Sequence, residues 1–542
     1  MTTLICAPIM VDETSSALER AARARELGAH IVEFRVDQVF SGAGDTSGAE
    51  RVMFHVERSP LPCIVTCRSA HEGGAYDGDD DARIALYEKL GTMGNPPKYL
   101  DLELSTYLRS ANLRQKVHLA IDHPNKSREH APGLILSVHD FEGRPKDLFK
   151  KLQELRAQKA ATIHKIVFRA RSVRDNLELF EILLDRDRPT IALGMGEDGL
   201  MSRVLAPKFG GFLTFASVEY GKETAPGQPT IRELRETYRF DSIGKRTKVY
   251  GLFGDPVGHS IGPEVHNAAF EAAGHDGVYL PMRIAKEAAY EGFKATVLEL
   301  LGATWLDFAG ASVTIPHKGH LVQLAEADTT RTWVIDEAVR LCGAANTMTV
   351  RDDGSVLVMN TDMPAIVALV RAQLGDDLGG AHVGVLGAGG VARAAAAGLA
   401  HAGARVTIFA RDVAKGEAMA KDIGLPNIAV RLWDGRLTAK SDCWVNATPL
   451  GMAGGPGPSE MPIDPREMET DVGGKSVVFD TVYRPLATPL VAAAREAGWG
   501  VIDGAALFAA QAAAQSRAWV GAGAPSSDFF ARITHEALAT LG

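Results

Sequence analysis

Cysteine is scarce in this chain. The 542 residues include five cysteines without regular spacing: Cys6, Cys63, Cys67, Cys342 and Cys443. Cys63 and Cys67 lie close together, but no second pair completes a tetrahedral zinc site. This pattern excludes a disulfide-stapled secreted domain and is typical of buried, reduced thiols. We therefore expect no metal site and a cytoplasmic location.

Net positive charge and long hydrophobic runs are absent as well. The formal net charge is -9, which argues against a nucleic-acid partner bound by a general basic surface. No apolar run reaches the roughly 18 residues needed to span a membrane. The opening "MTTLICAPIM" lacks the basic start of a signal peptide. If the substrate is an anion, local arginines must bind it against the field of the whole chain.

The chain is too long for one hydrophobic core. Single cores stop growing at about 250–300 residues, so 542 residues predict several domains. The composition, with 46% hydrophobic and 23% charged residues, is that of an ordinary globular protein. We expect an α/β fold class throughout.

Residues 1–240 alternate short apolar runs with amphipathic stretches such as "SSALERAARAREL". Eight strand–helix units in about 240 residues match a (β/α)8 TIM barrel, the fold we expect; an open doubly wound sheet is the alternative. The predicted strands are 3–9, 30–37, 62–68, 98–104, 134–140, 163–168, 190–195 and 212–218.

The second half of the chain predicts two further domains after a polar, basic linker at 241–248. A mixed α/β pattern over 249–364 indicates a substrate-binding domain, to which we also assign the C-terminal helices at 515–542. The segment "HVGVLGAGGVARAAAAGLAHAGARVTIFAR" contains a strand, a glycine-rich turn, a helix and a second strand. This order is typical of a Rossmann nucleotide-binding domain, which we place at 365–514.

Polar residues gather at the carboxyl ends of the predicted barrel strands, where such barrels place active sites. Lys165 lies within an otherwise apolar strand; it is either a lysine at a strand edge or a buried amine held for chemistry. A desolvated amine attacks carbonyls to form imines, and a histidine can move the proton that the imine acidifies. Arginines can hold a carboxylate in two-point contacts. We expect imine-forming chemistry on a small hydroxylated keto acid.

Two compact motifs of the substrate-binding region, "SVTIPHK" and "NTD", contain Lys318 and Asp362. Hydride transfer to a ketone needs a proton donor beside the carbonyl oxygen, and a lysine with a carboxylate partner can supply it. The alternative is an ordinary solvated lysine at a helix start.

The cofactor prediction depends on the end of the strand "TIFARD". Arg411 and Lys415 favour the extra phosphate of NADP, whereas Asp412 argues mildly against it. The glycines of "GAGGVA" let backbone N–H groups approach a pyrophosphate at a helix N-terminus. We expect NADP, with NAD as the alternative.

The motifs "EFRVD", "CRSAHEGG", "SVHDF", "HKIV", "SR" and "APGQ", in this order, resemble the type I 3-dehydroquinate dehydratases over residues 1–240. The resemblance implies that Lys165 is the Schiff-base lysine, that His139 is the general acid/base and that Glu72 orients His139. It implies these substrate-binding residues: Glu33, Arg35, Arg68, Arg203, Thr224 and Gln228. Thr224 stands where the family has serine, and residues 105–133 fit the family pattern poorly.

With "GDPVGHS", "GAANT", "NATPLGM", "DTVYRPLATPL" and "AAQAA", residues 249–542 resemble the shikimate dehydrogenases. The resemblance implies that Lys318 and Asp362 are the catalytic pair. The implied substrate-binding residues are Ser260, Thr314, Asn346, Tyr483 and Gln511. The cofactor-binding residues we expect are Gly387, Gly389, Gly390, Val391, Ala392, Arg411, Lys415 and Gly504.

Two departures from the dehydrogenase pattern stand out. The usual Ser-Lys-Ser-Pro motif is Ser260-Ile261-Gly262-Pro263 here, so one hydroxyl that would bind the substrate carboxylate is missing. Its loss costs about 1.5–3 kcal/mol if nothing replaces it, and it opens space at the ring carbon where quinate has an extra hydroxyl. The glycine resembles that of family members that use quinate. Met363 and Pro364 replace a usual glycine after Asp362, and we expect them to shift that carboxylate.

The dehydratase product is the dehydrogenase substrate, so the two resemblances together predict a bifunctional enzyme of aromatic amino-acid biosynthesis, similar to the fused enzyme of plants. The expected partners are 3-dehydroquinate, 3-dehydroshikimate, shikimate and quinate, with no nucleic acid and no membrane; the sequence fixes no oligomeric state. One alternative is a C-terminal half that acts mainly on quinate. A ligand sensor built from inactive copies is the other alternative, but it predicts missing catalytic residues, and these are present.

Overall fold

The computed structural model describes residues 2–12, 16–124, 128–221, 225–258, 260–468 and 476–540. The chain forms two compact units, Met1–Thr247 and Lys248–Gly542. The division falls within the predicted linker. None of the described helices is long and apolar enough to cross a membrane.

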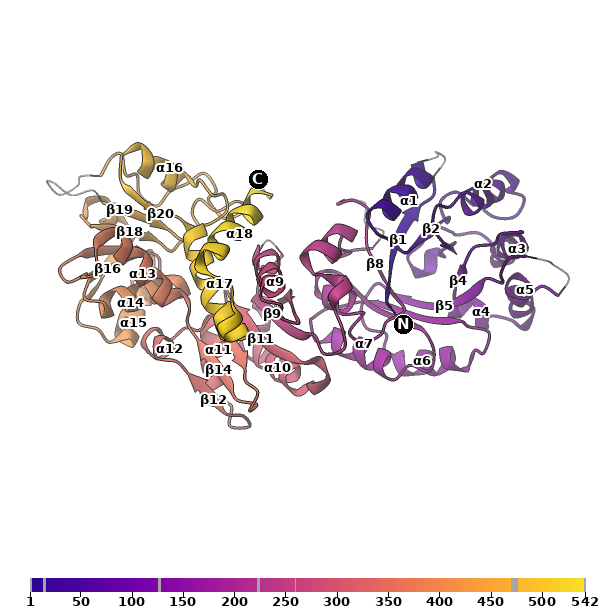
Figure 1. Cartoon of the computed structure of the whole chain (residues 1–542), viewed down its shortest axis with the longest axis horizontal. Helices are drawn as coiled ribbons and strands as arrows, with labels where there is room; N and C mark the ends of the chain where they lie inside the picture. Colours follow the sequence, from indigo (N-terminus) through magenta and orange to yellow (C-terminus); the bar gives the residue numbers. More distant parts are fainter. Residues whose placement is uncertain are drawn as a thin grey trace. The chain divides into compact units, whose positions relative to one another are not determined.

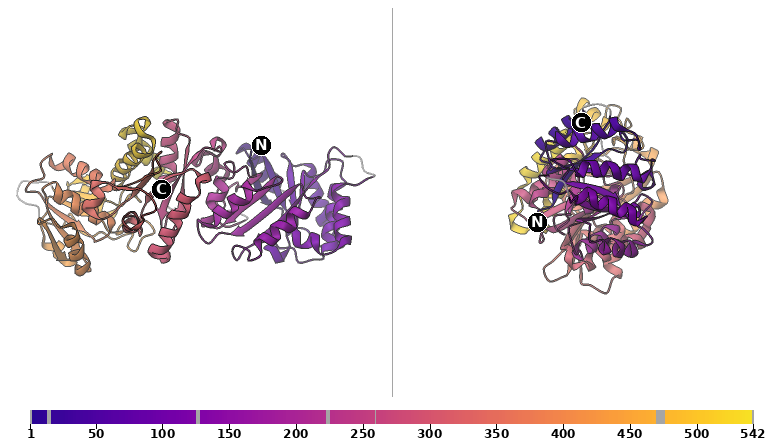
Figure 2. Two further views of the ribbon diagram at one scale, coloured as in Figure 1. Left: turned by 90° about the horizontal axis from the view of Figure 1, so that it is seen from below. Right: turned by 90° about the vertical axis from the view of Figure 1, so that its right-hand side faces the viewer.

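The first unit is a parallel eight-stranded barrel with its helices outside the strands (Figures 1 and 2). The strand order is β7-β6-β5-β4-β3-β2-β1-β8, and the N–H of Phe212 donates to the Thr190 carbonyl (2.8 Å) where the two outermost strands meet. The expected TIM-barrel fold is thus confirmed. The strands are β1 (Leu4–Met10), β2 (Ile31–Arg35), β3 (Cys63–Thr66), β4 (Tyr99–Glu103), β5 (Gly133–Asp140), β6 (Ile163–Arg169), β7 (Thr190–Met195) and β8 (Leu213–Phe215).

The helices of this unit follow the strands in sequence. They are α1 (Ser16–Glu26), α2 (Thr46–Glu57), α3 (Asp80–Gly91), α4 (Leu104–Leu108), α5 (Ala111–Ile121), α6 (Leu148–Ala157), α7 (Asp175–Leu184) and α8 (Leu200–Val204). The segment 105–133, which matched the family pattern poorly, contains α5 and most of α4. Helix α5 packs against α3, and Arg128 donates to the Ile121 carbonyl at its end (3.0 Å). The segment therefore supplies the outer helical layer beside β4.

The inward side chains of the barrel form layers of opposite character. One layer is apolar and takes side chains from seven strands: Cys6, Ile31, Ile64, Ile135, Ile163, Ile191 and Leu213. Side chains alternate along a strand, so residues two positions further on point to the same interior. On four of these strands the next residues are polar, namely Glu33, Thr66, Ser137 and Lys165, and β4 contributes Asp101 two positions after the partly buried Tyr99. The apolar layer closes the amino-terminal side of the barrel, and the polar groups lie toward the carboxyl ends.

The second unit begins with a mixed six-stranded sheet of order β10-β9-β11-β13-β14-β12, in which β13 is antiparallel to both of its neighbours. Its strands are β9 (Lys248–Gly254), β10 (Gly277–Arg283), β11 (Phe308–Val313), β12 (Trp333–Ile335), β13 (Thr347–Val350) and β14 (Val356–Met359). Its helices are α9 (Gly262–Ala272), α10 (Ala289–Gly302), α11 (Lys318–Ala327) and α12 (Glu337–Cys342).

A second six-stranded sheet, parallel throughout, has the order β17-β16-β15-β18-β19-β20 of a Rossmann-type domain. Its strands are β15 (His382–Leu386), β16 (Arg405–Ala410), β17 (Ile428–Leu432), β18 (Cys443–Asn446), β19 (Val477–Asp480) and β20 (Gly500–Ile502). The helices are α13 (Asp362–Leu374), α14 (Gly390–His401), α15 (Val413–Ile423), α16 (Pro489–Glu496), α17 (Gly504–Val520) and α18 (Ser527–Ala539).

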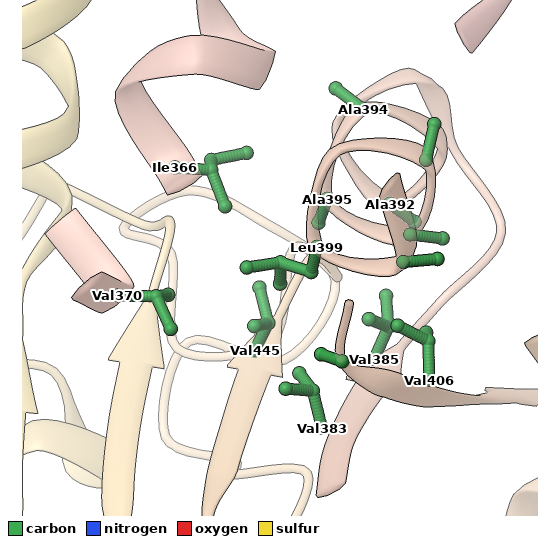
Figure 3. Packing of buried hydrophobic residues seen from close by; sticks show 14 of the residues in the cluster. Ile366, Val370, Val383, Val385, Ala392, Ala394, Ala395, Leu399, Val406 and Val445 are labelled. Atoms are coloured by element: carbon green, nitrogen blue, oxygen red, sulfur yellow. The ribbon is translucent and has the colours of Figure 1, made fainter. Parts of the chain in front are cut away.

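The core of this sheet depends on the small side chains of α14. Ala392, Ala395 and Leu399 are fully buried and pack toward Val385 and Val445 of the two central strands (Figure 3). Alanine allows close approach of helix and sheet, and this places the start of α14 at the carboxyl end of β15. The glycine-rich turn that we expected to bind a cofactor lies at that junction.

Two predicted domain boundaries, at 364 and 514, fall inside helices. Helix α13 begins at Asp362 beside the first sheet and packs along α14 of the second. Helix α17 begins at Gly504 and contacts α9, β11 and β13 of the first sheet. These two helices are shared by both sheets, so the boundaries cannot be drawn at a loop.

Candidate active sites

The carboxyl-terminal end of the barrel encloses a cavity lined by most of the residues that the sequence singled out. The lining includes Glu33, Arg35, Arg68, Glu72, His139, Lys165, Arg203 and Gln228. Thr224, the remaining residue expected at this site, lies outside the described residues. These side chains come from three strands, β2, β5 and β6, and from the segments that follow β3, β7 and β8.

Lys165 is a buried amine with two carboxylate neighbours. Its Nζ lies 2.8 Å from Asp101 Oδ2 and 3.6 Å from Glu33 Oε1, with 4% of the residue exposed. Nζ also lies 4.7 Å from the centre of the Phe215 ring, an arrangement that favours a cation. The lysine is therefore not at a strand edge, and its buried amine is paired with two carboxylates.

Asp101 connects this lysine to an arginine. Its Oδ1 accepts hydrogen bonds from Arg68 Nη2 and from Ser137 Oγ, each at 2.7 Å. Burial alone would raise the pKa of Asp101, but Arg68 and Lys165 outweigh it and lower the pKa well below its usual value. For Arg68, burial would lower the pKa, and Asp101 and Glu103 reverse that effect. Asp101 therefore remains a carboxylate throughout the working pH range.

His139 and Glu72 form a second pair in the same cavity. Glu72 Oε2 accepts from the backbone N–H of His139 (3.1 Å) and lies 3.2 Å from its Nδ1. Burial, followed by the positive charges of Arg68 and Lys165, lowers the pKa of His139 well below its usual value. Burial raises the pKa of Glu72 to about 7. When Glu72 is ionised, it accepts a hydrogen bond from Nδ1–H of His139, which leaves Nε2 as the basic nitrogen of a neutral imidazole.

Arg203 is a buried cation of another kind. It is 2% exposed, and the described residues provide no hydrogen bond or ion pair to its guanidinium. Burial lowers the pKa of Arg203 to about 10. Buried charges are normally paired, so a lone guanidinium lining a cavity is suited to a ligand anion. Arg35, by contrast, is paired in two places with Asp37 (2.9 and 3.0 Å).

Sequence analysis missed two residues of this site. Asp101 contacts Lys165 and Arg68, and Glu103 pairs with Arg68 (3.1 Å) and Arg83 (2.8 Å). The signal was available in "YLDLE", where acidic residues alternate with leucines on a strand that must be buried on both faces. Charges on one face of such a strand need partners, and here the partners are the cations of neighbouring strands.

The second site lies in the other unit, where Lys318 Nζ and Asp362 Oδ2 are 2.5 Å apart. Each residue is the first of its helix, α11 and α13 respectively, and both are buried. The expected shift of Asp362 does not separate this pair: Asn360 Oδ1 accepts from the Met363 N–H (2.9 Å) and caps the helix. Pro364 lies in the first turn of α13, where backbone N–H groups have no partner within the helix, so the N–H that proline lacks costs no helical hydrogen bond.

The other expected substrate-binding residues belong to the same unit. Asn346 donates to Thr361 Oγ1 (2.9 Å) and lies 3.5 Å from Gln511 Oε1. Ser260 Oγ accepts from the Gly262 N–H (3.1 Å) and hydrogen-bonds with Tyr483, whose pKa is raised by burial. Thr314 directly follows β11 and lies three residues before the fully buried His317. The group of hydroxyl and amide side chains is suited to a polyhydroxylated ring.

The glycine-rich turn fits a dinucleotide. Gly387 has φ +115°, and a Cβ there would lie 3.0 Å from the Ala447 carbonyl oxygen, so only glycine fits. A Cβ at Gly389 would meet nothing within 4 Å, and Gly390 lies next to the stem of Lys318. Val391 and Ala392 continue the first turn of α14, whose N–H groups are available to a phosphate. Gly504 approaches the backbone of Val482 too closely for any side chain.

At the end of β16, Arg411 favours binding of NADP and Asp412 argues against it, and the structure shows what each side chain does. Asp412 is the N-cap of α15, and its Oδ1 accepts from the Lys415 N–H (3.1 Å). The carboxylate is thus occupied by the helix, while the Arg411 and Lys415 side chains are exposed. The arrangement leaves two cations for a phosphate. Among the described residues, no group of three or more His, Cys, Asp and Glu side chains is arranged to hold a metal ion.

The chain contains two sites of different classes. The buried lysine that faces the barrel cavity is typical of a lyase, and the lysine–aspartate pair beside the glycine-rich turn is typical of a dehydrogenase. Residues 5–245 match the type I 3-dehydroquinase family model, and residues 252–348 match the shikimate dehydrogenase substrate binding domain. The chain belongs to the bifunctional 3-dehydroquinate dehydratase/shikimate dehydrogenase family.

Named relatives span one or both halves. The chloroplastic bifunctional 3-dehydroquinate dehydratase/shikimate dehydrogenase of Arabidopsis thaliana is 34% identical over 96% of this chain and 83% of its own. The shikimate dehydrogenase (NADP(+)) of Geobacter sp. (strain M21) is 37% identical over 52% of this chain and 93% of its own. The solved dehydroquinate dehydratase and shikimate dehydrogenase from S. pombe AroM covers 98% of both chains at 25% identity, with a TM-score of 0.40.

Proposed function

We propose that the chain catalyses two consecutive reactions, the dehydration of 3-dehydroquinate to 3-dehydroshikimate in the barrel and its NADPH-dependent reduction to shikimate in the second unit. Family membership supports both activities. The observation that carries the proposal is that each unit contains a buried lysine held by a carboxylate, Lys165 by Asp101 and Lys318 by Asp362.

In the barrel, the neutral amine of Lys165 attacks the ketone carbon and expels water to form an imine. The protonated imine withdraws electrons, so the neighbouring C–H becomes acidic. His139 Nε2 removes that proton, and the resulting imidazolium returns a proton to the departing hydroxyl, which leaves as water. Hydrolysis of the imine then releases the product and regenerates Lys165. Glu72 holds His139 in the required tautomer and orientation.

The cations of the barrel have different roles in binding. Arg203 has no partner among the described residues and faces the cavity, so we assign it to the substrate carboxylate. Arg68 holds Asp101, which in turn holds Lys165. Glu33, Arg35, Gln228 and Thr224 complete the proposed binding set. Arg203, which has no partner among the described residues, thereby fixes the orientation of a substrate that has one negative charge.

In the second unit, the ammonium of Lys318 donates a proton to the ketone oxygen, and Asp362 holds the lysine and accepts from a neighbouring substrate hydroxyl. NADPH, when bound, supplies the hydride. The turn at Gly387–Gly390 and the N-terminus of α14 would hold its pyrophosphate, and Arg411 and Lys415 its extra phosphate. Ser260, Tyr483, Asn346, Gln511 and Thr314 would hold the ring.

We place substrate binding in 249–364 with the helices of 515–542, and NADP binding in 365–514, with α13 and α17 shared. A cytoplasmic location stays a prediction from the sequence; the Arabidopsis relative is named as chloroplastic. The partners we propose are small molecules alone.

A two-stage assay on the purified chain tests the function. With 3-dehydroquinate alone, we expect 3-dehydroshikimate to accumulate; when NADPH is added, we expect shikimate and stoichiometric NADPH oxidation. Failure to form 3-dehydroshikimate would contradict the activity assigned to the barrel. Formation of 3-dehydroshikimate without oxidation of NADPH would contradict the activity assigned to the second unit. Substituting NADH tests the cofactor assignment.

A second candidate activity is the oxidation of quinate. The observation that favours it is Gly262, which leaves the position of the usual second serine without a side chain. Initial rates with quinate and with shikimate, each at saturating NADP, measure the preference. Shikimate rates higher by 100-fold or more, about 2.7 kcal/mol of transition-state preference, would reject quinate as a substrate of consequence.

A further inference from the structure

Glu103 is a buried carboxylate that contacts two parts of the barrel site at once. Its side chain is 1% exposed, and it does not line the described cavity. One of its oxygens, Oε1, lies 3.1 Å from Arg68 Nη1 and accepts from the backbone N–H of Ser69 at 3.0 Å. Arg68 and Ser69 are consecutive in the chain, but they lead to different catalytic groups.

Through Arg68, Glu103 is connected to the nucleophile. Arg68 Nη2 donates to Asp101 Oδ1 (2.7 Å), and Asp101 Oδ2 accepts from Lys165 Nζ (2.8 Å). The guanidinium thus lies between two carboxylates, with Glu103 beside Nη1 and Asp101 beside Nη2. Because a guanidinium is planar and rigid, a carboxylate at each of these nitrogens fixes the direction of both. The position of the Lys165 amine therefore depends on Glu103 through two intervening side chains.

Through Ser69, the same oxygen is connected to the acid/base pair. Ser69 is the N-cap of the short helix Ala70–Glu72, and its carbonyl accepts from the Glu72 N–H (3.0 Å). Glu72 in turn accepts from the His139 N–H (3.1 Å) and lies 3.2 Å from its Nδ1. Glu103 therefore anchors the start of the turn that positions Glu72, and with it the imidazole to which we assign proton removal.

Arg83 fixes the other oxygen of Glu103. Its Nη1 lies 2.8 Å from Glu103 Oε2 and donates to the Cys67 carbonyl (2.8 Å). Its Nη2 donates to Asp80 Oδ1 (2.7 Å) and to Thr106 Oγ1 (2.9 Å). Arg83 is fully buried, and a buried cation is costly unless it is paired. Glu103 is thus held at both oxygens and cannot shift within the barrel without weakening an ion pair.

We propose that Glu103, held by Arg83, is a positioning residue for dehydration that couples the placement of the Lys165 amine to that of the His139 ring. The inference rests on the proposed dehydratase function. The two groups act on neighbouring carbons of one substrate, because the amine bonds to the ketone carbon and the imidazole takes the proton beside it. A displacement of about 1 Å in either group can lower the rate by about 100-fold. A support that is shared by both groups keeps their spacing constant.

Trapping with borohydride at successive times during a single turnover of 3-dehydroquinate by the full-length chain separates the two effects. The adducts on Lys165 before and after dehydration differ in mass by one water. The appearance of any adduct measures imine formation, and the conversion of the first adduct into the second measures elimination, in which His139 removes the proton. The final amount of adduct counts the correctly folded barrels, so each rate is expressed per folded barrel.

Glu103→Gln keeps the shape of the side chain and removes its charge, and the amide cannot accept from both Arg68 and Arg83. We expect both rates to fall by about 10-fold or more. KM for 3-dehydroquinate should change less than kcat, because Glu103 does not line the described cavity.

Three other variants provide the comparison. Asp101→Asn should slow mainly imine formation, and Glu72→Gln mainly elimination, since each acts on one of the two catalytic groups. Glu178→Gln is the matched control: it removes the charge of another carboxylate of this unit, which accepts from Arg144 Nη2 (2.7 Å) and does not line the described cavity. We expect it to leave both rates unchanged.

The pH profile of dehydration is a second measurement, which a smaller amount of folded protein would not change. The polar groups that face Glu72 are Arg68, Glu103, Ser105 and His139. Burial raises the pKa of Glu72 most, and the like charge of Glu103 raises it further. In Glu103→Gln, the fall of kcat/KM on the acid side should therefore move to lower pH. Glu103→Asp keeps the charge on a shorter side chain, so we expect lower rates with the fall at its wild-type pH.

A Glu103→Gln chain in which only one of the two rates falls, or neither, overturns the coupling, as does an acid-side fall that stays at its wild-type pH. If this variant yields no folded barrels, Glu103→Asp decides, and rates within about twofold of the wild type overturn the proposal. A wild-type chain that forms no adduct rejects the proposed dehydratase function itself, which distinguishes that failure from a failure of Glu103 as a positioning residue.

Discussion

Lys318 Nζ and Asp362 Oδ2 are 2.5 Å apart, although 44 positions separate the two residues in the chain. Each begins a helix, and the two helices start at the same end of the first sheet of the second unit. The pair is buried, and neither member has another ion pair among the described residues, so removing either one leaves an uncompensated charge.

Lys318→Met should lower the turnover of NADPH-dependent reduction by about 100-fold or more, because the proton donor is lost. Dehydration in the barrel, measured on the same preparation, serves as the control, since the two sites belong to separate compact units. An unchanged reduction rate would remove Lys318 from the mechanism.

Borohydride added with 3-dehydroquinate should trap an adduct on Lys165, detectable as a mass increase of one peptide. Lys165→Met should show no adduct and no dehydration. In Asp101→Asn, the adduct should still form but more slowly, since the carboxylate positions the amine at 2.8 Å. Wild-type dehydration by Lys165→Met would refute the imine.

Dehydration should weaken as pH falls through about 7, the value to which burial raises the pKa of Glu72. The direction follows from the hydrogen bond between the two residues. Above this pH the Glu72 carboxylate accepts a hydrogen bond from Nδ1–H of His139; below it the carboxyl is neutral and holds the imidazole ring poorly. A pH profile of kcat/KM from 5 to 9 measures this limb. Glu72→Gln does not titrate, so this variant should be slower and its kcat/KM should not fall below about pH 7. The same fall in Glu72→Gln would show that another group is responsible for it.

Arg203→Met should raise the KM for 3-dehydroquinate by about 10- to 100-fold, the effect of one charged hydrogen-bonding partner. The ligand-free protein should at the same time become more stable to heat, because a buried guanidinium without a partner among the described residues is removed. Measurements of KM and of the melting temperature on one preparation test both. A lower melting temperature would mean that Arg203 has a structural partner.

Arg411→Ala should raise the KM for NADP by about tenfold or more while changing that for NAD little, because the side chain is free to bind the extra phosphate. Asp412→Ala offers a contrast: it removes the N-cap of α15 and should reduce thermal stability by about 1 kcal/mol. If Asp412→Ala improves binding of NADP instead, the carboxylate opposes the phosphate despite its cap.

The barrel could be derived from sequence because its strands are apolar, regularly spaced and separated by amphipathic helices. The predicted strand at 163–168 corresponds to β6 (Ile163–Arg169), and that at 190–195 coincides with β7. Residues such as Lys165 were identifiable because a charge within a buried strand is costly. The predicted boundaries at 364 and 514 cut through α13 and α17 because no local signal marks a helix that packs against two sheets.

Partner choice within the site was the part that sequence could not provide. Asp101 lies 64 positions from Lys165, and although "YLDLE" indicates buried acidic residues, it does not indicate which cation each of them pairs with. Likewise, the glycine at 262 suggested open space, whereas a Cβ there would lie 3.1 Å from Tyr279 Cε1 and 3.2 Å from Ser260 Oγ. The packing around a residue depends on side chains that are distant in the sequence, and no local pattern records it.

The apolar layer at the amino-terminal side of the barrel has a kinetic consequence. Among the described residues, side chains such as Ile31, Ile135 and Ile163 fill the interior on the amino-terminal side, so the barrel cavity opens toward the carboxyl ends of the strands. The dehydration product must leave through the opening by which the reactant entered, and a bound product blocks the next turnover. Accumulated 3-dehydroshikimate should therefore inhibit the barrel competitively, and its removal by the second reaction relieves that inhibition.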